Sequence, residues 1–384
     1  MRCRMNRRMV IGALAALPVG RAARVRATSV ATPGAGPREI RYAVVDLGVL
    51  AGGDTSAATC VNGRGVAAGS SVGTTSDETS LSQAVVFRGG QVTTLRVGGI
   101  PGSSSVNAIN GTGDCAGFAQ DGSGLFRAIV WVGGEAIALP ALGGGQCMAF
   151  GVNDDSLVVG WAQPGAPAIE PRACRWEDGR ATDLGTLGEG IRSVAYGVNA
   201  AGAIVGASTI ELDDTRPAAE HAVLWLRDET VDLGTIGGNY SAAAAINDTG
   251  RIVGVSTTGR QQRPFGPGTH ATLWDDGSPP VDLGTLGTGE RSQATAINAA
   301  GVIVGSSATS EELPNGEIGQ EHACLWEAGA TAPRPQDLND LIVAGSGWDL
   351  ERANGINDAG QIVGVGYLFG KPRAFLLDPA NPAS

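Results

Sequence analysis

The sequence is poor in charged residues and has no apolar stretch long enough to cross a membrane. Charged residues make up 17% of the 384 residues, whereas 42% are hydrophobic. Because disordered chains show the opposite balance, this chain can bury a core. A candidate span, residues 9–19, has only 11 residues, and a transmembrane helix needs about 20. We therefore expect no stable membrane insertion.

Cysteine is scarce, and no two cysteines form a CxxC pair. One of the six, Cys3, lies close to the amino terminus. The other five are Cys60, Cys115, Cys147, Cys174 and Cys324. An odd number without paired spacing argues against a disulfide framework and against a structural zinc site. We interpret these side chains as small buried hydrophobic groups and leave open a single disulfide among them.

Motifs of common enzyme classes are also absent. The sequence has no DxDxDG calcium loop, its Gly pairs such as Gly237-Gly238 match neither a phosphate-binding nor a dinucleotide-binding motif, and none of the three His has an obvious partner for a serine nucleophile. We therefore expect no cofactor and assign no catalytic or metal-binding residue. An active site built from scattered polar residues would leave no linear motif, so the sequence alone does not decide whether the protein is an enzyme.

The chain is acidic, and many of its basic residues lie near the amino terminus. The formal net charge is -11, and residues 1–27 contain seven Arg and no Asp or Glu. The rest of the chain therefore has 20 basic and 38 acidic residues. Such an acidic surface argues against nucleic acid and anionic membranes as partners.

Residues 1–27 have the features of a signal peptide. Four Arg within the first eight residues precede the apolar stretch, and Val25-Arg26-Ala27 offers small residues at both recognition positions for cleavage after Ala27. Residues 6–11 (NRRMVI) resemble a twin-arginine signal, and a Sec signal is the alternative. We expect a flexible linker over residues 28–40 and a location in the periplasm or outside the cell.

A nine-residue pattern, with Asn near its start and Gly at its end, recurs seven times. Copies include VNGRGVAAG, VNAAGAIVG and INDTGRIVG. The Asn residues are Asn62, Asn110, Asn153, Asn199, Asn247, Asn298 and Asn357, and the final Gly residues are Gly69, Gly117, Gly160, Gly206, Gly254, Gly305 and Gly364. The gaps between the Asn residues are 48, 43, 46, 48, 51 and 59 residues, which indicates a long internal repeat. An Asn that bonds to the backbone two residues on, flanked by apolar strands, favours a β-hairpin.

Each copy has two further strand signals. One is a strand that ends in an aromatic residue, such as AVVF, AIVW or ACLW. The other is centred on Asp-Leu, mostly followed by Gly, at Asp46, Asp183, Asp232, Asp282 and Asp337, and copies two and three have weaker versions around Leu95 and Leu139. Tight turns between these strands force antiparallel pairing, because parallel strands need long crossovers. Four antiparallel strands in each of seven copies predict an all-β fold, a seven-bladed β-propeller over residues 41–379 with residues 380–384 as a tail.

The two ends of the repeat array complement each other. Residues 42–47 form an Asp-Leu-Gly strand with no aromatic strand before it, and residues 374–377 form an aromatic-type strand with no Asp-Leu-Gly strand after it. Pairing residues 41–47 with residues 374–378 would complete the seventh blade and remove a free edge. We predict this closure between the N-terminal strand and the C-terminal blade, and we expect a monomer.

The most regular copies read DLGTIGGNYSAAAAINDTGRIVGVS followed by an HAxLW-type strand. The corresponding tripeptides begin at His221, His270 and His322, with Arg373 at this position in the last copy. This pattern resembles the HAF repeat of extracellular bacterial proteins, over about residues 42–378, most specifically in copies four to six. The resemblance implies export and a propeller-like array. That family has no established activity or catalytic residues, so none is carried over to this chain.

The recurring polar residues fit a framework role. The three His are the only ones in the chain and share one repeat position, where other copies have Gln83, Arg127, Arg172 and Arg373. Equivalent residues of neighbouring blades should lie more than about 10 Å apart, whereas zinc ligands lie about 2 Å from one point. We therefore interpret this position as a polar donor, and the recurrent Asp as a turn cap or an inter-blade contact.

Residues that depart from the repeat are the better candidates for function. Long connections precede the aromatic strand in copies four to six, and copy seven contains the insertion LNDLIVAGSGWDLER. Loops on a rigid scaffold commonly carry binding residues. From these segments we name Arg263, Phe265, Trp348, Asp349 and Arg352 as candidates to grip a sugar or a peptide. The competing interpretation is ordinary loop drift, with Trp348 packed over the core.

The sequence therefore favours a binding or scaffold propeller, with a carbohydrate or a protein as its partner. One alternative is a propeller hydrolase or lyase with its site at the mouth of the central channel. Another is a purely structural surface protein.

Overall fold

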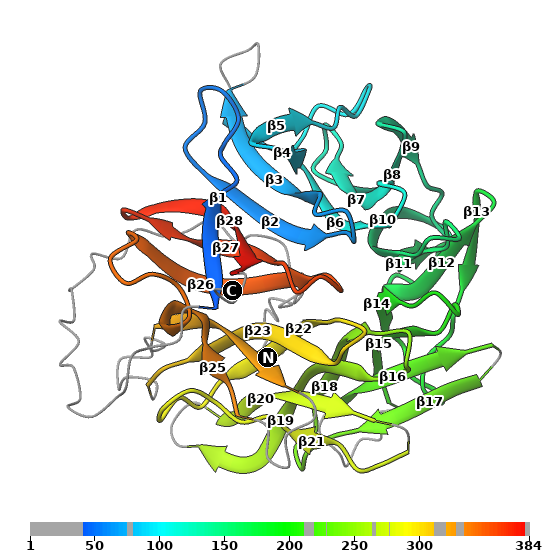
Figure 1. Cartoon of the computed structure of the whole chain (residues 1–384). Helices are drawn as coiled ribbons and strands as arrows, with labels where there is room; N and C mark the ends of the chain where they lie inside the picture. Colours follow the sequence, from blue (N-terminus) through cyan, green and yellow to red (C-terminus); the bar gives the residue numbers. More distant parts are fainter. Residues whose placement is uncertain are drawn as a thin grey trace, which may run out of the picture. The chain divides into compact units, whose positions relative to one another are not determined.

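The computed structural model describes residues 41–74, 80–210, 219–227, 229–262, 266–275, 277–310, 320–327 and 334–380. These residues belong to the second of two units of the chain, residues 38–384. The described strands form seven separate sheets of four strands, which are arranged in a ring around a common axis (Figure 1). The predicted all-β fold, a seven-bladed propeller, is confirmed.

Each blade is an antiparallel sheet whose first strand lies innermost in the ring and whose fourth strand lies outermost. From first to fourth, the strands are β2 (Ser56–Val61), β3 (Ala67–Thr74), β4 (Ser80–Arg88) and β5 (Gln91–Thr94) in blade 1; β6 (Ser104–Ile109), β7 (Cys115–Gln120), β8 (Phe126–Val132) and β9 (Glu135–Ala138) in blade 2; β10 (Gly143–Val152), β11 (Val158–Pro164), β12 (Arg172–Glu177) and β13 (Arg180–Asp183) in blade 3; β14 (Ser193–Val198), β15 (Ile204–Thr209), β16 (Glu220–Leu226) and β17 (Glu229–Gly234) in blade 4; β18 (Ser241–Ile246), β19 (Ile252–Gln262), β20 (Gly266–Trp274) and β21 (Val281–Asp282) in blade 5; β22 (Ser292–Ile297), β23 (Val302–Ala308), β24 (Glu321–Glu327) and β25 (Gln336–Asp337) in blade 6; and β26 (Trp348–Ile356), β27 (Ile362–Leu368), β28 (Lys371–Pro379) and β1 (Tyr42–Asp46) in blade 7. A short 3₁₀ helix, η1 (Leu338–Asp340), precedes β26. In the described part of the chain no helix has the length and apolar character needed to cross a membrane.

Strand β1 closes the ring from the other end of the chain. It pairs with β28, from Tyr42 opposite Pro379 to Asp46 opposite Phe375. The innermost strands contact one another in sequence around the axis, and β2 contacts β26. The predicted pairing of the N-terminal strand with the C-terminal blade is confirmed. Opening the ring there would break the hydrogen bonds that hold β1 in blade 7.

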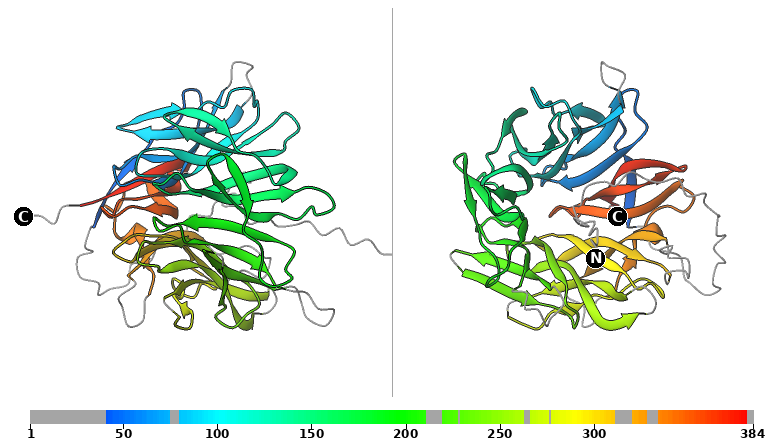
Figure 2. Two further views of the ribbon diagram at one scale, coloured as in Figure 1. Left: turned by 90° about the vertical axis from the view of Figure 1, so that its right-hand side faces the viewer. Right: turned by 180° about the vertical axis from the view of Figure 1, so that it is seen from behind.

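The turns of every blade alternate between the two faces of the ring, because consecutive strands run in opposite directions. The Asn face has the turns between the first and second strands and between the third and fourth strands. The loop face has the connections between the second and third strands and the connections between blades; Figure 2 shows the ring from the side and from behind. Every innermost strand therefore runs from the loop face to the Asn face. Residues at the start of an innermost strand lie at the inner rim of the loop face.

The recurrent Asn forms a closed ring of hydrogen bonds at the Asn face. All seven side chains are buried, and each oxygen accepts backbone N–H groups of its own turn, as Asn62 does from Arg64 and Val66. Each side-chain amide also donates to the backbone carbonyl of the Asn in the next blade, at 2.9 to 3.2 Å, and Asn357 completes the ring by donating to Asn62. The contact within the turn was predicted. The ring of seven bonds between blades was not.

The recurrent Gly lies where the second strand passes a bulge in the first. In blade 5 the pairing of β18 with β19 skips a residue between Ala243 and Ala245, and Gly254 lies opposite Ala243. A Cβ atom at Gly254 would overlap the carbonyl oxygen of Ala242. The same overlap with the first strand occurs at Gly69, Gly117, Gly160, Gly206, Gly305 and Gly364. Close approach of two backbones therefore accounts for Gly at this position in every blade.

The hydrophobic core fills the spaces between neighbouring blades. The aromatic residues that end the third strands are buried, and Trp131, Trp176 and Trp326 are at most 1% exposed. Their indole N–H groups donate to carbonyl oxygens of the preceding connection between blades, at 3.3, 2.7 and 2.9 Å. Each of these Trp residues thus fastens one blade to the previous one.

Candidate functional site

Each of the three His pairs with an Asp of its own blade. The pairs, with their Nδ1–carboxylate distances, are His221–Asp232 (2.9 Å), His270–Asp282 (2.8 Å) and His322–Asp337 (2.6 Å). They join the third and fourth strands of blades 4, 5 and 6, so the imidazoles do not converge on one point. The Asp side chains also accept the backbone N–H two residues on, as Asp232 does from Gly234 at 2.8 Å. The interpretation of these Asp residues as turn caps is confirmed, and the His position belongs to the framework.

The charge of His322 contributes to stability in a pH-dependent way. Burial lowers the pKa of the imidazole, but the hydrogen bond and negative charge of Asp337, with smaller contributions from Asp349 and Asp340, outweigh it and raise the pKa above its usual value. A raised pKa means that the stabilisation is complete below the unfolded-state value, about 6.5, and is lost as the pH rises through the folded-state value.

We therefore expect His322→Gln to lower the melting temperature below about pH 6, and this difference from wild type to shrink as the pH rises. Gln is a suitable replacement, because Gln83 occupies the equivalent position opposite Ser71 in blade 1. Thermal melts of both proteins between about pH 5 and pH 9 measure the effect. A difference that grows with pH would show that the imidazole is neutral in the folded protein.

The candidate binding residues are only partly within the described chain. The structure describes Trp348, Asp349 and Arg352, all on β26, whereas Arg263 and Phe265 lie outside the described residues. Trp348 packs edge-on against Phe375, with ring centroids 6.1 Å apart, at the border of the blade 7 core. It therefore contributes to packing. Asp349 instead accepts a hydrogen bond from Gln320 of the preceding blade, at 3.0 Å.

Arg352 belongs to a polar network between blades 6 and 7. Its Nη2 and Nε atoms lie 2.6 and 2.7 Å from one carboxylate oxygen of Glu321, at the start of β24. Ser306 donates to the other oxygen at 3.4 Å, and Gln293 donates to Ser306 at 3.2 Å. Although β26 is an innermost strand with a blade on each side, 44% of the Arg352 side chain is exposed. Because β24 begins at the loop face, its first residue, Glu321, places this ion pair toward that face.

A second Arg–Glu pair lies within blade 4, next to the start of blade 5. Arg192 donates through Nη1 to Glu220 at 3.2 Å, and the two side chains are 17% and 19% exposed. Glu220 begins β16, and its backbone forms a bridge with Tyr240, the residue before β18. Burial raises the pKa of the Glu220 carboxyl, although the positive charge of Arg192 opposes this. Burial also raises the pKa of Tyr240, and the negative charge of Glu220 adds to the rise.

Arg192, Glu220 and Glu321 were not predicted from the sequence as functional residues. Glu220 and Glu321 hold the same position, directly before the His of the repeat tripeptide, at the end of connections that were treated only as variable loops. The Glu-His dipeptide, present in copies four and six, was the available signal.

The cysteines fit the framework interpretation. All five in the described chain are free, and four of them are buried. Burial raises the pKa of Cys115 and Cys174 to about 12, so their thiols stay protonated and are poor nucleophiles near neutral pH. Cys147 accepts the backbone N–H of Ala128 at 3.4 Å, a contact between blades that serine hydroxyls make elsewhere in the ring.

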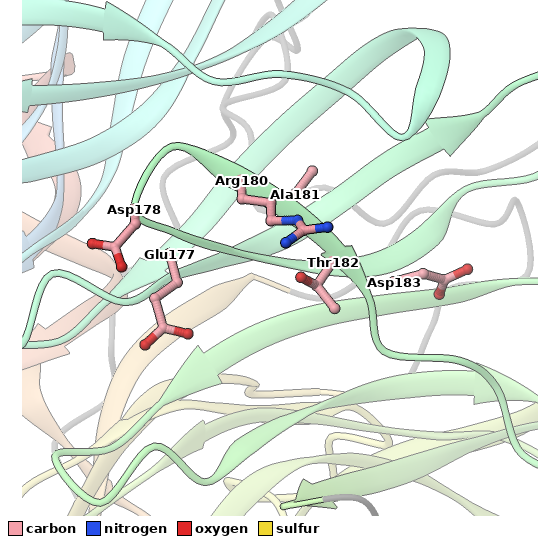
Figure 3. Close-up of a pocket in the computed structure, with 6 residues that line it drawn as sticks. All are labelled: Glu177, Asp178, Arg180, Ala181, Thr182 and Asp183. Carbon is pink, nitrogen blue, oxygen red and sulfur yellow. The ribbon is translucent and has the colours of Figure 1, made fainter.

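A shallow hollow lies on the outside of blade 3. It is lined by Glu177, Asp178, Arg180, Ala181, Thr182 and Asp183, which all belong to the β12–β13 hairpin (Figure 3). Because a single hairpin supplies every lining residue, the hollow cannot enclose a ligand from several sides. It is a weaker candidate than the inner rim of the loop face.

Part of the chain is similar to a family without an assigned function. A family model described as "Protein of unknown function (DUF3466)" matches residues 189–374, a segment that includes blades 4 to 6 and most of blade 7. No curated protein matches the chain. Among solved structures, an acylaminoacyl peptidase from Pyrococcus horikoshii is similar with a TM-score of 0.47 and 13% identity, over 85% of this chain and 50% of that one. The chain thus spans about half the length of that peptidase.

Proposed function

We propose that this protein is an exported propeller that binds carbohydrate at the inner rim of the loop face and acts as a binding protein rather than an enzyme. Export is supported by the signal-like residues 1–27. The site is supported by one observation above all: Arg352, held by Glu321 at 2.6 Å, keeps 44% of its side chain exposed on an innermost strand. The other recurring polar groups are engaged in the framework.

The Arg352 network suits sugar hydroxyls, which donate and accept hydrogen bonds at once. The guanidinium group offers donors in a fixed plane, and the Glu321 carboxylate beside it offers acceptors. Two short hydrogen bonds hold both groups in place, so little side-chain entropy is left to lose when a ligand binds. A protein partner would need a contact area of about 800 Å² on each side, far more than this small set of side chains provides.

Replacing Arg352 by alanine is expected to weaken glycan binding by about thirtyfold, the loss typical of a central anchor residue. The measurement is calorimetric titration of the purified protein with oligomers of glucose, N-acetylglucosamine and galacturonate. Arg251→Ala is the matched control, because Arg251 forms an ion pair with Asp275 at 3.0 Å on the Asn face, with comparable exposure.

Equal weakening by both variants, or no binding of any sugar, would rule out the proposed site. Capture of a protein that survives Arg352→Ala would favour a protein partner. Cleavage of any oligomer in the same samples would favour the alternative of a propeller hydrolase or lyase.

A further inference from the structure

We infer that Arg192, Glu220 and Tyr240 form a second sugar subsite at the same rim, so that the ligand is a neutral oligosaccharide rather than a single sugar. This inference rests on the proposed function and adds to it the length and charge of the ligand. It comes from a part of the rim separate from Arg352, in blades 4 and 5.

The carboxylates of the two subsites are equivalent in position. Glu220 lies opposite Thr209 on β15, and Glu321 lies opposite Ala308 on β23. These are corresponding residues of blades 4 and 6, so both carboxylates lie at the same height on the loop face. Each carboxylate pairs with one Arg: Glu220 with Arg192, which precedes the innermost strand of the same blade, and Glu321 with Arg352, on the innermost strand of the next blade.

The framework does not require charged groups at this position. Blade 1 has Ser82 and Thr55 at the positions of Glu220 and Arg192, and it makes the same backbone bond at this point, from Val72 N–H to the Thr55 carbonyl at 3.0 Å. In blade 4 the equivalent hydrogen bond runs from the Thr209 N–H to the Arg192 carbonyl at 2.9 Å. An ion pair that the fold can omit is a better candidate for recognition than for stability.

Two further features of the second subsite point to a ligand. The Nε atom of Arg192 is buried and has no hydrogen-bond partner. Among the described arginines, only Arg172 also has such a buried Nε atom. A buried donor of this kind costs stability. Tyr240 is 36% exposed beside the pair, and its ring offers a flat apolar face with a polar hydroxyl, which suits the two sides of a sugar ring. Behind it, Tyr196 packs on Phe150 with ring centroids 5.3 Å apart.

The rim between the two subsites is polar, whereas the other side of the ring is not. Blade 5 contributes Thr269 and the start of blade 6 contributes Arg291, and their backbones form the bridge equivalent to that of Glu220 with Tyr240. In blades 2 to 4 the corresponding space is filled by a buried apolar cluster of Phe118, Met148, Trp161 and Val194. A chain of linked sugars would therefore follow the rim from blade 4 to blade 7.

The charges of both subsites favour a neutral chain. Arg192 is paired with Glu220 and Arg352 with Glu321, so neither pair has a net charge. The protein as a whole carries a formal charge of -11 and would repel a polymer of uronic acids.

The test is titration with glucose and N-acetylglucosamine oligomers of one to six units, and with galacturonate oligomers as the acidic contrast. In the wild type we expect affinity to rise with chain length for a neutral sugar. Arg192→Ala and Tyr240→Ala should each reduce the gain in affinity with chain length by about tenfold. Tyr240→Phe should keep most of this gain because the ring remains. Melting temperatures, with Arg251→Ala alongside, show that the variants are folded.

The two proposals fail in different ways. If Arg352→Ala weakens binding but affinity does not depend on chain length, or if Arg192→Ala and Tyr240→Ala bind the longest oligomer as wild type does, the second subsite is wrong and the first stands. Preference for galacturonate would overturn the neutral ligand. Absence of any binding, or binding that Arg352→Ala leaves intact, would overturn the proposed function itself.

Discussion

Replacing Gly254 by alanine is expected to lower the free energy of unfolding by about 3 kcal/mol, the upper end of the usual cost of overpacking. The added Cβ would overlap the carbonyl oxygen of Ala242 and crowd the backbone of Ala243. Both obstacles are backbone atoms of the innermost strand, which also touches the neighbouring blades, so the strand cannot move aside alone. Denaturant unfolding followed by tryptophan fluorescence measures the change.

Gly63→Ala is the matched control, because a Cβ at Gly63 would meet no atom within 4 Å. We expect that variant to unfold within about 0.5 kcal/mol of wild type. If the two alanine variants were equally stable, close approach at the bulge could not be the reason for the recurrent Gly.

Replacing Asn247 by aspartate is expected to lower the free energy of unfolding by about 3 kcal/mol at neutral pH. The carboxylate can still accept the backbone N–H groups of Thr249 and Arg251, as the amide oxygen does at 3.1 and 3.0 Å. It cannot donate to the Asn298 carbonyl, which now receives the side-chain amide at 3.0 Å. Two acceptors would face each other in a buried place, and the ring of seven bonds would be broken.

A protonated aspartate could donate to the Asn298 carbonyl again, so the destabilisation of Asn247→Asp should depend on pH. Repulsion by the Asn298 carbonyl should raise the pKa of the new carboxyl in the folded state. A carboxyl whose pKa is raised in the folded state destabilises the protein at pH values above its unfolded-state pKa, about 3.9. This destabilisation decreases as the pH falls toward that pKa. Denaturant unfolding at several pH values should show that the difference in free energy of unfolding between Asn247→Asp and wild type becomes smaller in acid. The difference for Asn247→Ala should stay the same. A pH-independent deficit in both variants would mean that only the turn matters.

Most of the fold could be predicted because the signals were local and repeated. The Asn turn, the aromatic strand and the Asp-Leu strand each define a short element from a few neighbouring residues. Seven repetitions made each signal clear even where single copies were weak. Closure by β1 could be predicted as well. Residues 42–47 lacked an aromatic strand before them, and residues 374–377 lacked an Asp-Leu-Gly strand after them, so each segment could supply the strand that the other lacked.

The contacts between copies could not be predicted in the same way. A side-chain amide such as that of Asn62 can donate to many acceptors, and its choice of Asn110, 48 residues away, depends on how blades pack. The His–Asp pairs, 11 to 15 residues apart, depend on the register between the third and fourth strands. That register is set by turns whose lengths differ from copy to copy.

The candidate site was predicted in part. Asp349 and Arg352 lie at the inner rim as residues of an innermost strand, whereas Trp348 packs against Phe375. The partners of Arg352 come from another blade, so no linear pattern joins them. Arg192 and Glu220 are 28 residues apart in the sequence and meet only because the start of an innermost strand lies beside the start of the third strand.

The central claim is that the repeated polar residues hold the fold while the residues that break the repeat bind the ligand. One measurement tests it most directly: melting temperature and oligosaccharide affinity determined together for Arg352→Ala and His270→Gln. We expect Arg352→Ala to lose affinity for the oligosaccharide at a nearly unchanged melting temperature, because exposed ion pairs contribute at most about 1 kcal/mol. His270→Gln, which breaks the pair with Asp282, should melt earlier and bind as wild type does. Loss of affinity in His270→Gln, with full affinity in Arg352→Ala, would contradict the central claim.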